Sequence, residues 1–273
     1  MRLSIISDEI SRDPLTAAEI AAEWGLRHLE LRMYYATRAP QGMSDADFAA
    51  VGKAAASFGL DVTSISPGLF KLRLDDPAIA EHRGALRTRC LEMAQALGAG
   101  VMVVFPYVRT DRDEPEDVWP EELVADFRAT AELAAARGIT VAVENEPICY
   151  AATGESLARL LAEIDHPNCG ANWDPANAFA YAPQDFRAGY EALRGRIVHV
   201  HIKDHAPGPD GKRRVVPPGE GQVGWPEQVH ALIADGYRGL AVIETHFTPK
   251  VAGSRACAQA IQAILEDAGE AIE

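Results

Sequence analysis

The chain has 273 residues, of which 48% are hydrophobic and 24% are charged, a composition typical of a folded globular protein. Lysine and arginine number 26 against 40 aspartates and glutamates, so the formal net charge is −14. A surface this acidic repels the phosphates of nucleic acids and anionic membranes, and we therefore expect neither as a partner.

The cysteines and the N-terminal segment predict a reduced, cytoplasmic location. The four cysteines show no CxxC spacing, which favours free thiols: Cys90, Cys149, Cys169 and Cys257. The apolar run in MRLSIISDEI is too short for a signal peptide, because Asp8 and Glu9 interrupt it. No stretch approaches the roughly 18 apolar residues that a membrane helix needs.

Short apolar runs rich in β-branched residues alternate with amphipathic, alanine-rich stretches along the chain. The runs predict eight buried strands, over residues 3–7, 28–32, 61–66, 101–105, 139–144, 169–174, 196–202 and 240–244. Helices are expected over residues 16–25, 44–59, 77–98, 120–138 and 155–164. Thr16 and Ser44 suit helix N-caps, and Pro120 suits a first helical turn. Glycines follow the predicted helix ends at Gly25, Gly59, Gly98 and Gly138.

Eight strand–helix units predict a (β/α)8 barrel, a TIM barrel, in a single domain over residues 1–273. A nucleotide-binding sheet has no motif support, because the sequence contains neither GxGxxG after the first strand nor GxxxxGK[ST]. The longest irregular stretch is APGPDGKRRVVPPGEG, residues 206–221. It follows the seventh predicted strand and is a candidate active-site loop.

Ionisable side chains stand at the ends of the last four predicted strands. Glu144, Asp174 and Glu244 end strands five, six and eight, and His201 lies near the end of strand seven. Because the carboxyl ends of barrel strands meet at one mouth, we expect these four side chains to lie together. Three carboxylates and one imidazole suit one divalent cation, Mn²⁺ or Mg²⁺ before Co²⁺ or Zn²⁺.

Several of these positions have an alternative interpretation. Asp174 precedes a proline and could simply cap a helix. His199 shares a strand face with His201 and is expected either to pack or to donate a hydrogen bond to the site. Glu30 and Arg32 either contact substrate or pair with each other, and Lys203 either steadies a substrate oxygen or pairs with Asp204. Five residues are candidates for substrate binding: Arg32, Glu146, Asn177, Lys203 and His246.

At these residues the chain resembles the sugar phosphate isomerase/epimerase superfamily of xylose isomerase-like TIM barrels. The most specific segments are VAVENEP (141–147), ANWDPAN (171–177), HVHIKD (199–204), PGEGQVGW (218–225) and VIETH (242–246). The resemblance implies one divalent metal held by Glu144, Asp174, His201 and Glu244. It also implies that Glu144 and Glu244 act as the catalytic acid/base pair.

The activity that this resemblance implies is isomerisation or epimerisation of a sugar, keto-sugar or polyol derivative, by proton transfer through a metal-stabilised enediolate. A dehydratase of the inosose or 3-dehydroshikimate type is the alternative, and a homodimer or homotetramer is possible within the superfamily. Two features depart from the ketose 3-epimerases. Asn177 stands where they carry a substrate-binding histidine, and Lys203, Arg213 or Arg214 would have to replace an arginine that follows their metal histidine.

Overall fold

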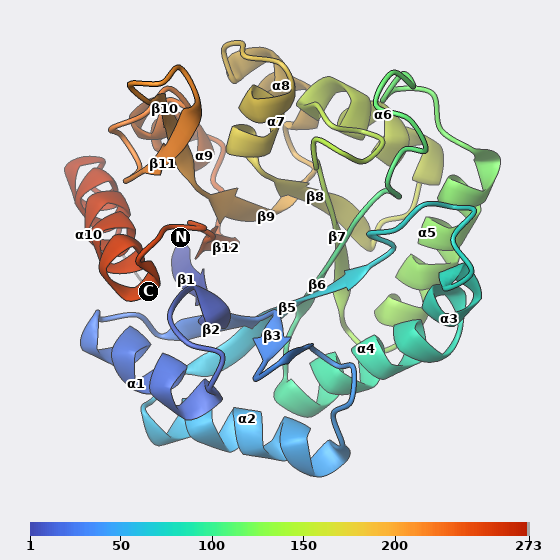
Figure 1. Cartoon of the computed structure of the whole chain (residues 1–273), viewed down its shortest axis with the longest axis horizontal. Helices are drawn as coiled ribbons and strands as arrows, with labels where there is room; N and C mark the ends of the chain where they lie inside the picture. The colour runs from blue at the N-terminus through green and yellow to red at the C-terminus, as the bar shows by residue number, and fades with distance from the viewer. Residues whose placement is uncertain (272–273) are drawn as a thin grey trace.

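Eight parallel strands close into a barrel in the computed structural model, which describes residues 1–271 (Figure 1). The strands follow one another around the barrel as β1 (Arg2–Ile6), β12 (Leu240–Ile243), β9 (Ile197–Ile202), β8 (Cys169–Trp173), β7 (Thr140–Glu144), β6 (Val101–Val104), β5 (Asp61–Leu69) and β2 (His28–Leu31). The first and last strands close the ring, with Arg2 beside Leu240 and Ile5 beside Ile243. The predicted (β/α)8 barrel is confirmed.

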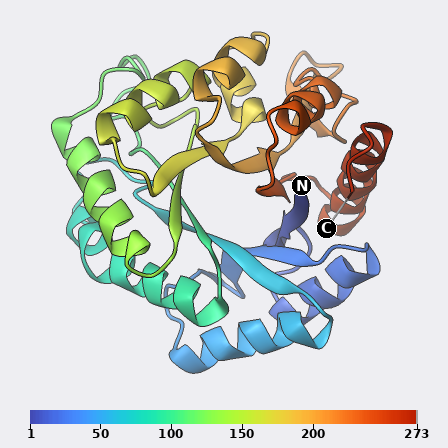
Figure 2. The same cartoon turned by 180° about the vertical axis from the view of Figure 1, so that it is seen from behind.

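Helices surround the barrel on its outside (Figure 2). They are α1 (Pro14–Glu23), α2 (Asp45–Ser57), α3 (Ile79–Arg83), α4 (Ala85–Leu97), α5 (Glu121–Ala135), α6 (Gly154–Ile164), α7 (Pro175–Tyr181), α8 (Arg187–Leu193), α9 (Trp225–Ala234) and α10 (Lys250–Asp267). All of them except α3 bury apolar side chains. In α6, for example, the buried leucines and isoleucine recur at helical spacing, and each contributes about 1.5–3 kcal/mol by leaving water.

Three details of the predicted helices differ in the structure. The helix expected over residues 77–98 is divided into α3 and α4 at Gly84, whose backbone (φ −116°, ψ −103°) is not helical. Helix α1 begins earlier than expected, because Asp13 rather than Thr16 is its N-cap and accepts the backbone N–H of Thr16. Pro120 is the N-cap residue of α5 and lies just before its first turn. The four glycines predicted after helices all have positive φ.

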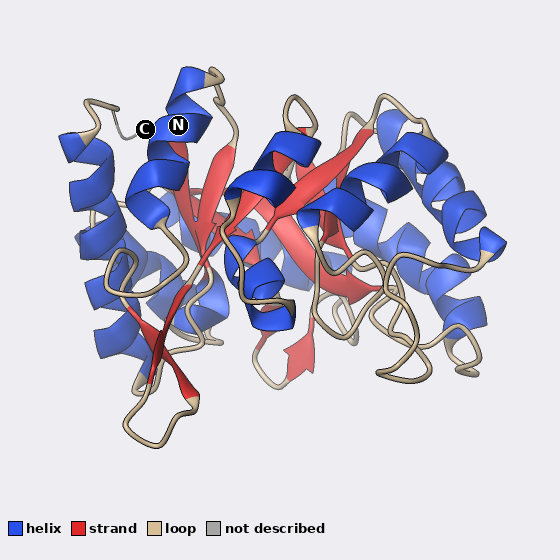
Figure 3. Ribbon diagram, turned by 90° about the horizontal axis from the view of Figure 1, so that it is seen from above, coloured by secondary structure: helices blue, strands red, loops and turns tan. Residues whose placement is uncertain are grey.

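Two small hairpins project from the side of the barrel that faces away from the chain termini (Figure 3). One pairs β3 (Met33–Tyr34) with β4 (Thr37–Arg38), and the other pairs β10 (Asp204–Pro207) with β11 (Arg213–Val216). The stretch expected to be irregular, residues 206–221, is therefore partly a hairpin. None of the helices in residues 1–271 has the length and apolarity that a bilayer crossing requires.

Candidate metal centre

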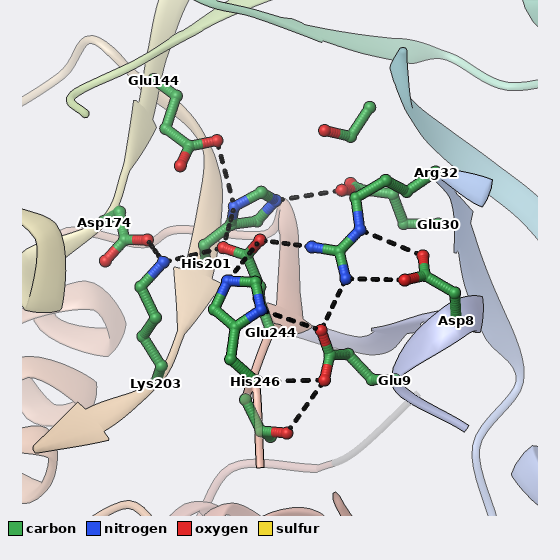
Figure 4. Close-up of polar contacts among 12 residues, drawn as sticks. Asp8, Glu9, Glu30, Arg32, Glu144, Asp174, His201, Lys203, Glu244 and His246 are labelled. Carbon is green, nitrogen blue, oxygen red and sulfur yellow. Dashed lines mark hydrogen bonds and ion pairs between the residues drawn. The ribbon is translucent and has the colours of Figure 1, made fainter. Parts of the chain in front are cut away.

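Four buried side chains from four strands converge at the mouth of the barrel (Figure 4). Glu144 ends β7, Asp174 follows β8, His201 lies on β9 and Glu244 follows β12. One oxygen or nitrogen from each lies within 4.8 Å of the others. Nδ1 of His201 is 3.3 Å from an oxygen of Glu144 and 3.3 Å from an oxygen of Glu244. The structure thus brings together the four residues that the sequence predicts as ligands.

One atom of this cluster fits a metal better than it fits the protein alone. Among residues 1–271, Nδ1 of His201 is buried and has no hydrogen-bond partner, whereas Oδ2 of Asp174 is held by the ammonium of Lys203 at 2.6 Å. A buried polar atom without a hydrogen bond costs about 1–3 kcal/mol. This nitrogen and the three carboxylates beside it are donors that divalent cations accept. The residues present therefore fit a divalent metal ion.

Asp174 serves as a helix cap and still contributes to the cluster. Its Oδ1 accepts the backbone N–H of Asn177 at 2.9 Å and caps α7, while Oδ2 belongs to the cluster. Asn145 fixes the backbone of Asp174 through two hydrogen bonds, of 2.7 and 2.9 Å. Burial raises the pKa of Asp174 to about 6, although the ammonium of Lys203 opposes this rise. The cap and the ligand interpretations of Asp174 are therefore compatible.

Glu30 lies behind the cluster and orients two histidines. Its carboxylate is 2.7 Å from Nε2 of His199 and 3.0 Å from Nε2 of His201, and it accepts a hydrogen bond from Ser64 at 2.8 Å. Burial opposes ionisation, but His201 and His199 hold the pKa of Glu30 well below its usual range. An Nε2–H on His201 leaves the Nδ1 lone pair free for a metal. The expected pair with Arg32 is wrong, because Glu30 pairs with the two histidines instead, and substrate contact through Glu30 stays a prediction.

Arg32 crosses the mouth and binds three acids. Its guanidinium donates to Glu244 at 2.6 Å, to Glu9 at 2.6 Å and to both oxygens of Asp8 at 3.0 and 2.8 Å. Burial alone would lower the pKa of Arg32, but Glu244 and Asp8 outweigh it and raise the pKa. Asp8 and Glu9 follow β1, a position that could have marked them as candidates for the mouth. The structure gives Arg32 a role in holding Glu244.

Lys203 also binds the cluster and not its neighbour in sequence. Its ammonium is 2.6 Å from Asp174 and 2.8 Å from Glu244 (Figure 4). The expected alternative, a pair with Asp204, is wrong. Lys203 is thus a buried cation that balances part of the negative charge of the carboxylates.

Asp204 organises the loop that follows the second hairpin. Its two oxygens accept backbone N–H groups from four residues, at 2.8–3.1 Å: His205, Gly219, Gly221 and Val223. A Cβ at Gly221 would lie 2.1 Å from Oδ1 of Asp204, so this approach requires a glycine. Trp225 adds a hydrogen bond from its indole to the carbonyl of Lys203 at 2.8 Å. The segment PGEGQVGW is therefore folded around Asp204 beside the site.

The cluster opens into a cavity of about 320 Å³ at the barrel mouth. Its lining includes all five residues predicted to bind substrate: Arg32, Glu146, Asn177, Lys203 and His246. Among them, Glu146 pairs with Lys71 at 2.6 Å, and the amide of Asn177 donates to Glu144 at 2.9 Å. His246 is half exposed and lies 3.3 Å from Glu244. We call this space, defined by its lining residues, the mouth cavity.

Comparison with known proteins agrees with the barrel fold. The chain matches the family described as xylose isomerase-like TIM barrel over residues 18–266. The chain belongs to this family. No curated protein matches it in sequence.

Solved structures of xylose isomerase-like barrels superpose on nearly the whole chain. The probable 3-DHS dehydratase AsbF from Bacillus anthracis is 19% identical, with a TM-score of 0.77 over 96% of this chain and 99% of that one. D-allulose 3-epimerase from Methylomonas sp., solved with D-allulose, is 17% identical, with a TM-score of 0.75 over 98% and 96%. The IolI protein, solved with a zinc atom, is 18% identical, with a TM-score of 0.74 over 98% of each chain. At these identities the similarity establishes a shared fold.

Within this xylose isomerase-like barrel, Asn177 has a contact that explains its position. Its side-chain amide and that of Asn172 donate to the two oxygens of Glu144, at 2.9 and 3.1 Å. Neutral donors therefore hold Glu144, whereas the cations Arg32 and Lys203 hold Glu244. The two glutamates therefore differ in basicity, because the surroundings of a carboxylate set its basicity.

Proposed function

We propose that the chain is a divalent-metal-dependent isomerase or epimerase, acting on a sugar, keto-sugar or polyol derivative by moving a proton on a carbon beside a carbonyl. The observation that carries the proposal is the placement of two glutamates, Glu144 and Glu244, around one ligand cluster at the base of the mouth cavity. Proton abstraction needs such a carboxylate within reach of the substrate. Solved barrels of this fold include sugar epimerases and a dehydratase, which supports an enzymatic role.

Glu144, Asp174, His201 and Glu244 would hold the metal ion. When bound, the ion would act as a Lewis acid toward the oxygens of the substrate. The oxygen-rich donor set favours Mn²⁺ or Mg²⁺, whereas the zinc atom of the IolI structure makes Zn²⁺ the first alternative to test.

We assign Glu144 as the base that takes the proton and Glu244 as its partner. Burial would raise the pKa of both, but nearby cations outweigh it: His201 lowers the pKa of Glu144, and Lys203 with His201 holds that of Glu244 well below its usual range. Both carboxylates are therefore ionised in the absence of substrate. The amide donors on Glu144 leave it the more basic of the two. Glu244, which must first take up a proton from solvent, would then return a proton to the other face or to the adjacent carbon.

The test is exchange of substrate hydrogens with solvent. Metal-loaded protein is incubated in deuterium oxide with a panel of keto-sugars and inososes, and the products are followed by NMR. Deuterium on the carbon beside the carbonyl, with an inverted or isomerised product, is the expected result. Elimination of water would instead identify a dehydratase, and neither reaction on any member of the panel would contradict the proposal.

Two substitutions then test whether hydrogen exchange depends on the two glutamates. Glu144→Gln and Glu244→Gln should each slow exchange by about 100-fold or more. Glu19→Gln, an exposed position on α1, is the matched control and should not change the rate. The metal content of each variant is measured in parallel, because loss of the ion and loss of the base are separate effects.

A further inference from the structure

The mouth cavity contains one cation that no acid neutralises. Four cationic side chains line it: Arg32, Arg38, Lys71 and Lys203. Arg32 and Lys203 bind the acids of the metal centre, and Lys71 pairs with Glu146. In the described part of the chain, the guanidinium of Arg38 has no ion pair, and its only hydrogen bond runs from Nη1 to the carbonyl of Ser66 at 3.2 Å. The remaining donors of its guanidinium are available to a ligand.

A glycine in the neighbouring strand leaves the space that the side chain of Arg38 occupies. Arg38 ends the hairpin of β3 and β4, and its side chain lies across Gly68 near the end of β5. A Cβ at Gly68 would lie 2.7 Å from Nη1 and 2.9 Å from Cδ of Arg38, and the φ of Gly68 is +74°. Any larger residue at position 68 would displace the guanidinium. The glycine therefore leaves room for Arg38 at the wall of the cavity.

An unpaired cation in this place is unfavourable without a ligand. Arg38 is partly buried, and burial together with the neighbouring Arg32 lowers its pKa. Removing a charge from water costs free energy unless an opposite charge compensates for it. Arg38 also lies within electrostatic range of Glu144 and Glu244, so a small molecule at the metal centre could reach it. His205 lines the same cavity, and its buried Nδ1 lacks a hydrogen-bond partner among residues 1–271.

We propose that the mouth cavity selects a substrate with an anionic terminal group, a carboxylate or a phosphate, which the guanidinium of Arg38 binds. The planar fork of arginine matches the oxygens of either group and forms charge-assisted hydrogen bonds with them. The cavity of about 320 Å³ suits a molecule with the size of a single sugar acid or sugar phosphate. This inference rests on the proposed function for the sugar part of the substrate and adds the class of its charged end.

The test measures binding, which does not depend on turnover. Full-length protein with excess Mn²⁺ is titrated by calorimetry with D-fructuronate, D-fructose 6-phosphate and D-fructose, which share a skeleton and differ in their terminal group. We expect at least one anion to bind tenfold or more tightly than D-fructose. The tighter of the two anions identifies the carboxylate or the phosphate as the preferred group.

Three variants connect that preference to Arg38. Arg38→Gln should remove the preference and leave D-fructose binding within about twofold, whereas Arg38→Lys should retain part of it, because a charge without the fork remains. Arg27→Gln makes the same change at an exposed position before β2 and should have no effect. Equal binding of anions and D-fructose by the unmodified protein, no binding of either anion, or an unchanged preference in Arg38→Gln would each overturn the inference. An anion preference that depends on Arg38, without hydrogen exchange on any substrate, would contradict the proposed function alone.

Discussion

Oε1 of Glu30 lies 3.0 Å from Nε2 of His201, while Nδ1 of the same ring faces the carboxylates of Glu144 and Glu244. The buried carboxylate of Glu30 thus sets which nitrogen of His201 carries the hydrogen. The same carboxylate uses its other oxygen for His199 and Ser64, so one acid orders two consecutive inward positions of β9. In the proposed metal centre, Glu30 would position His201 and would not itself be one of the four ligands.

Replacing Glu30 with glutamine should weaken metal binding about 10- to 100-fold, the usual effect of removing the partner of a metal-binding histidine. Glutamine has one acceptor oxygen, whereas the structure places two imidazole nitrogens against the two oxygens of Glu30. The dissociation constant for Mn²⁺ is measured by calorimetry, with circular dichroism to check that the variant is folded. Glu19→Gln is the control. A folded Glu30→Gln protein with unchanged affinity would show that Glu30 does not orient His201.

Lys203→Met should destabilise the metal-free protein by about 3–5 kcal/mol, because Asp174 and Glu244 would lose the cation that they share. Bound metal would compensate the same carboxylates. The metal-dependent increase in Tm should therefore be larger for Lys203→Met than for the unmodified protein. Thermal unfolding with EDTA and with Mn²⁺ measures both effects, and Lys53→Met, exposed on α2, is the control. Equal increments in Tm would show that lysine and metal do not stabilise the same groups.

The barrel could be predicted from the sequence, because the features that mark its strands and helix ends lie within short segments. Runs of β-branched residues marked the strands, and glycines such as Gly98 marked helix ends where φ is positive. The hairpin of β10 and β11 was missed, because the prolines and glycines of residues 206–221 suggest a loop and do not reveal a pair of edge strands.

Partners within the site could not be read from the sequence in the same way. Residue types at strand ends predicted the ligand cluster, but the contact of Arg32 with Glu244 joins residues 212 positions apart. Only the register of a closed barrel decides which cation meets which acid. No sequence feature marked Arg38 as a residue of the site, because it belongs to a hairpin of two-residue strands and follows no apolar run.

Asp204→Asn should loosen the loop over residues 219–223 beside the mouth cavity. An asparagine offers one acceptor oxygen where the structure uses both oxygens of Asp204 for four backbone N–H groups. Hydrogen bonds to a charged group contribute about 1.5–3 kcal/mol each, so these amides should exchange tenfold or more faster. Hydrogen–deuterium exchange with mass spectrometry measures this effect. Asp210→Asn, at the exposed turn of the hairpin, should leave the loop unchanged, and equal exchange in both variants would contradict the role of Asp204.

Metal affinity should decrease as the pH falls below about 6. Burial raises the pKa of Asp174 to about 6, so at lower pH its carboxyl holds a proton in the metal-free protein. That proton must leave before the oxygen can bind a cation. The metal affinity should therefore fall by about tenfold for each pH unit below the pKa. Above that pH the carboxylate is already ionised, and this group should add no further dependence.

Calorimetric titration with Mn²⁺ at several pH values between 7 and 5 measures this dependence. Repetition in buffers with different ionisation enthalpies should show that binding releases more protons near pH 5 than near pH 7. Circular dichroism at each pH separates loss of affinity from acid unfolding. An affinity that stays constant from pH 7 to pH 5, in folded protein, would mean that the carboxyl of Asp174 is not protonated there or does not bind the ion.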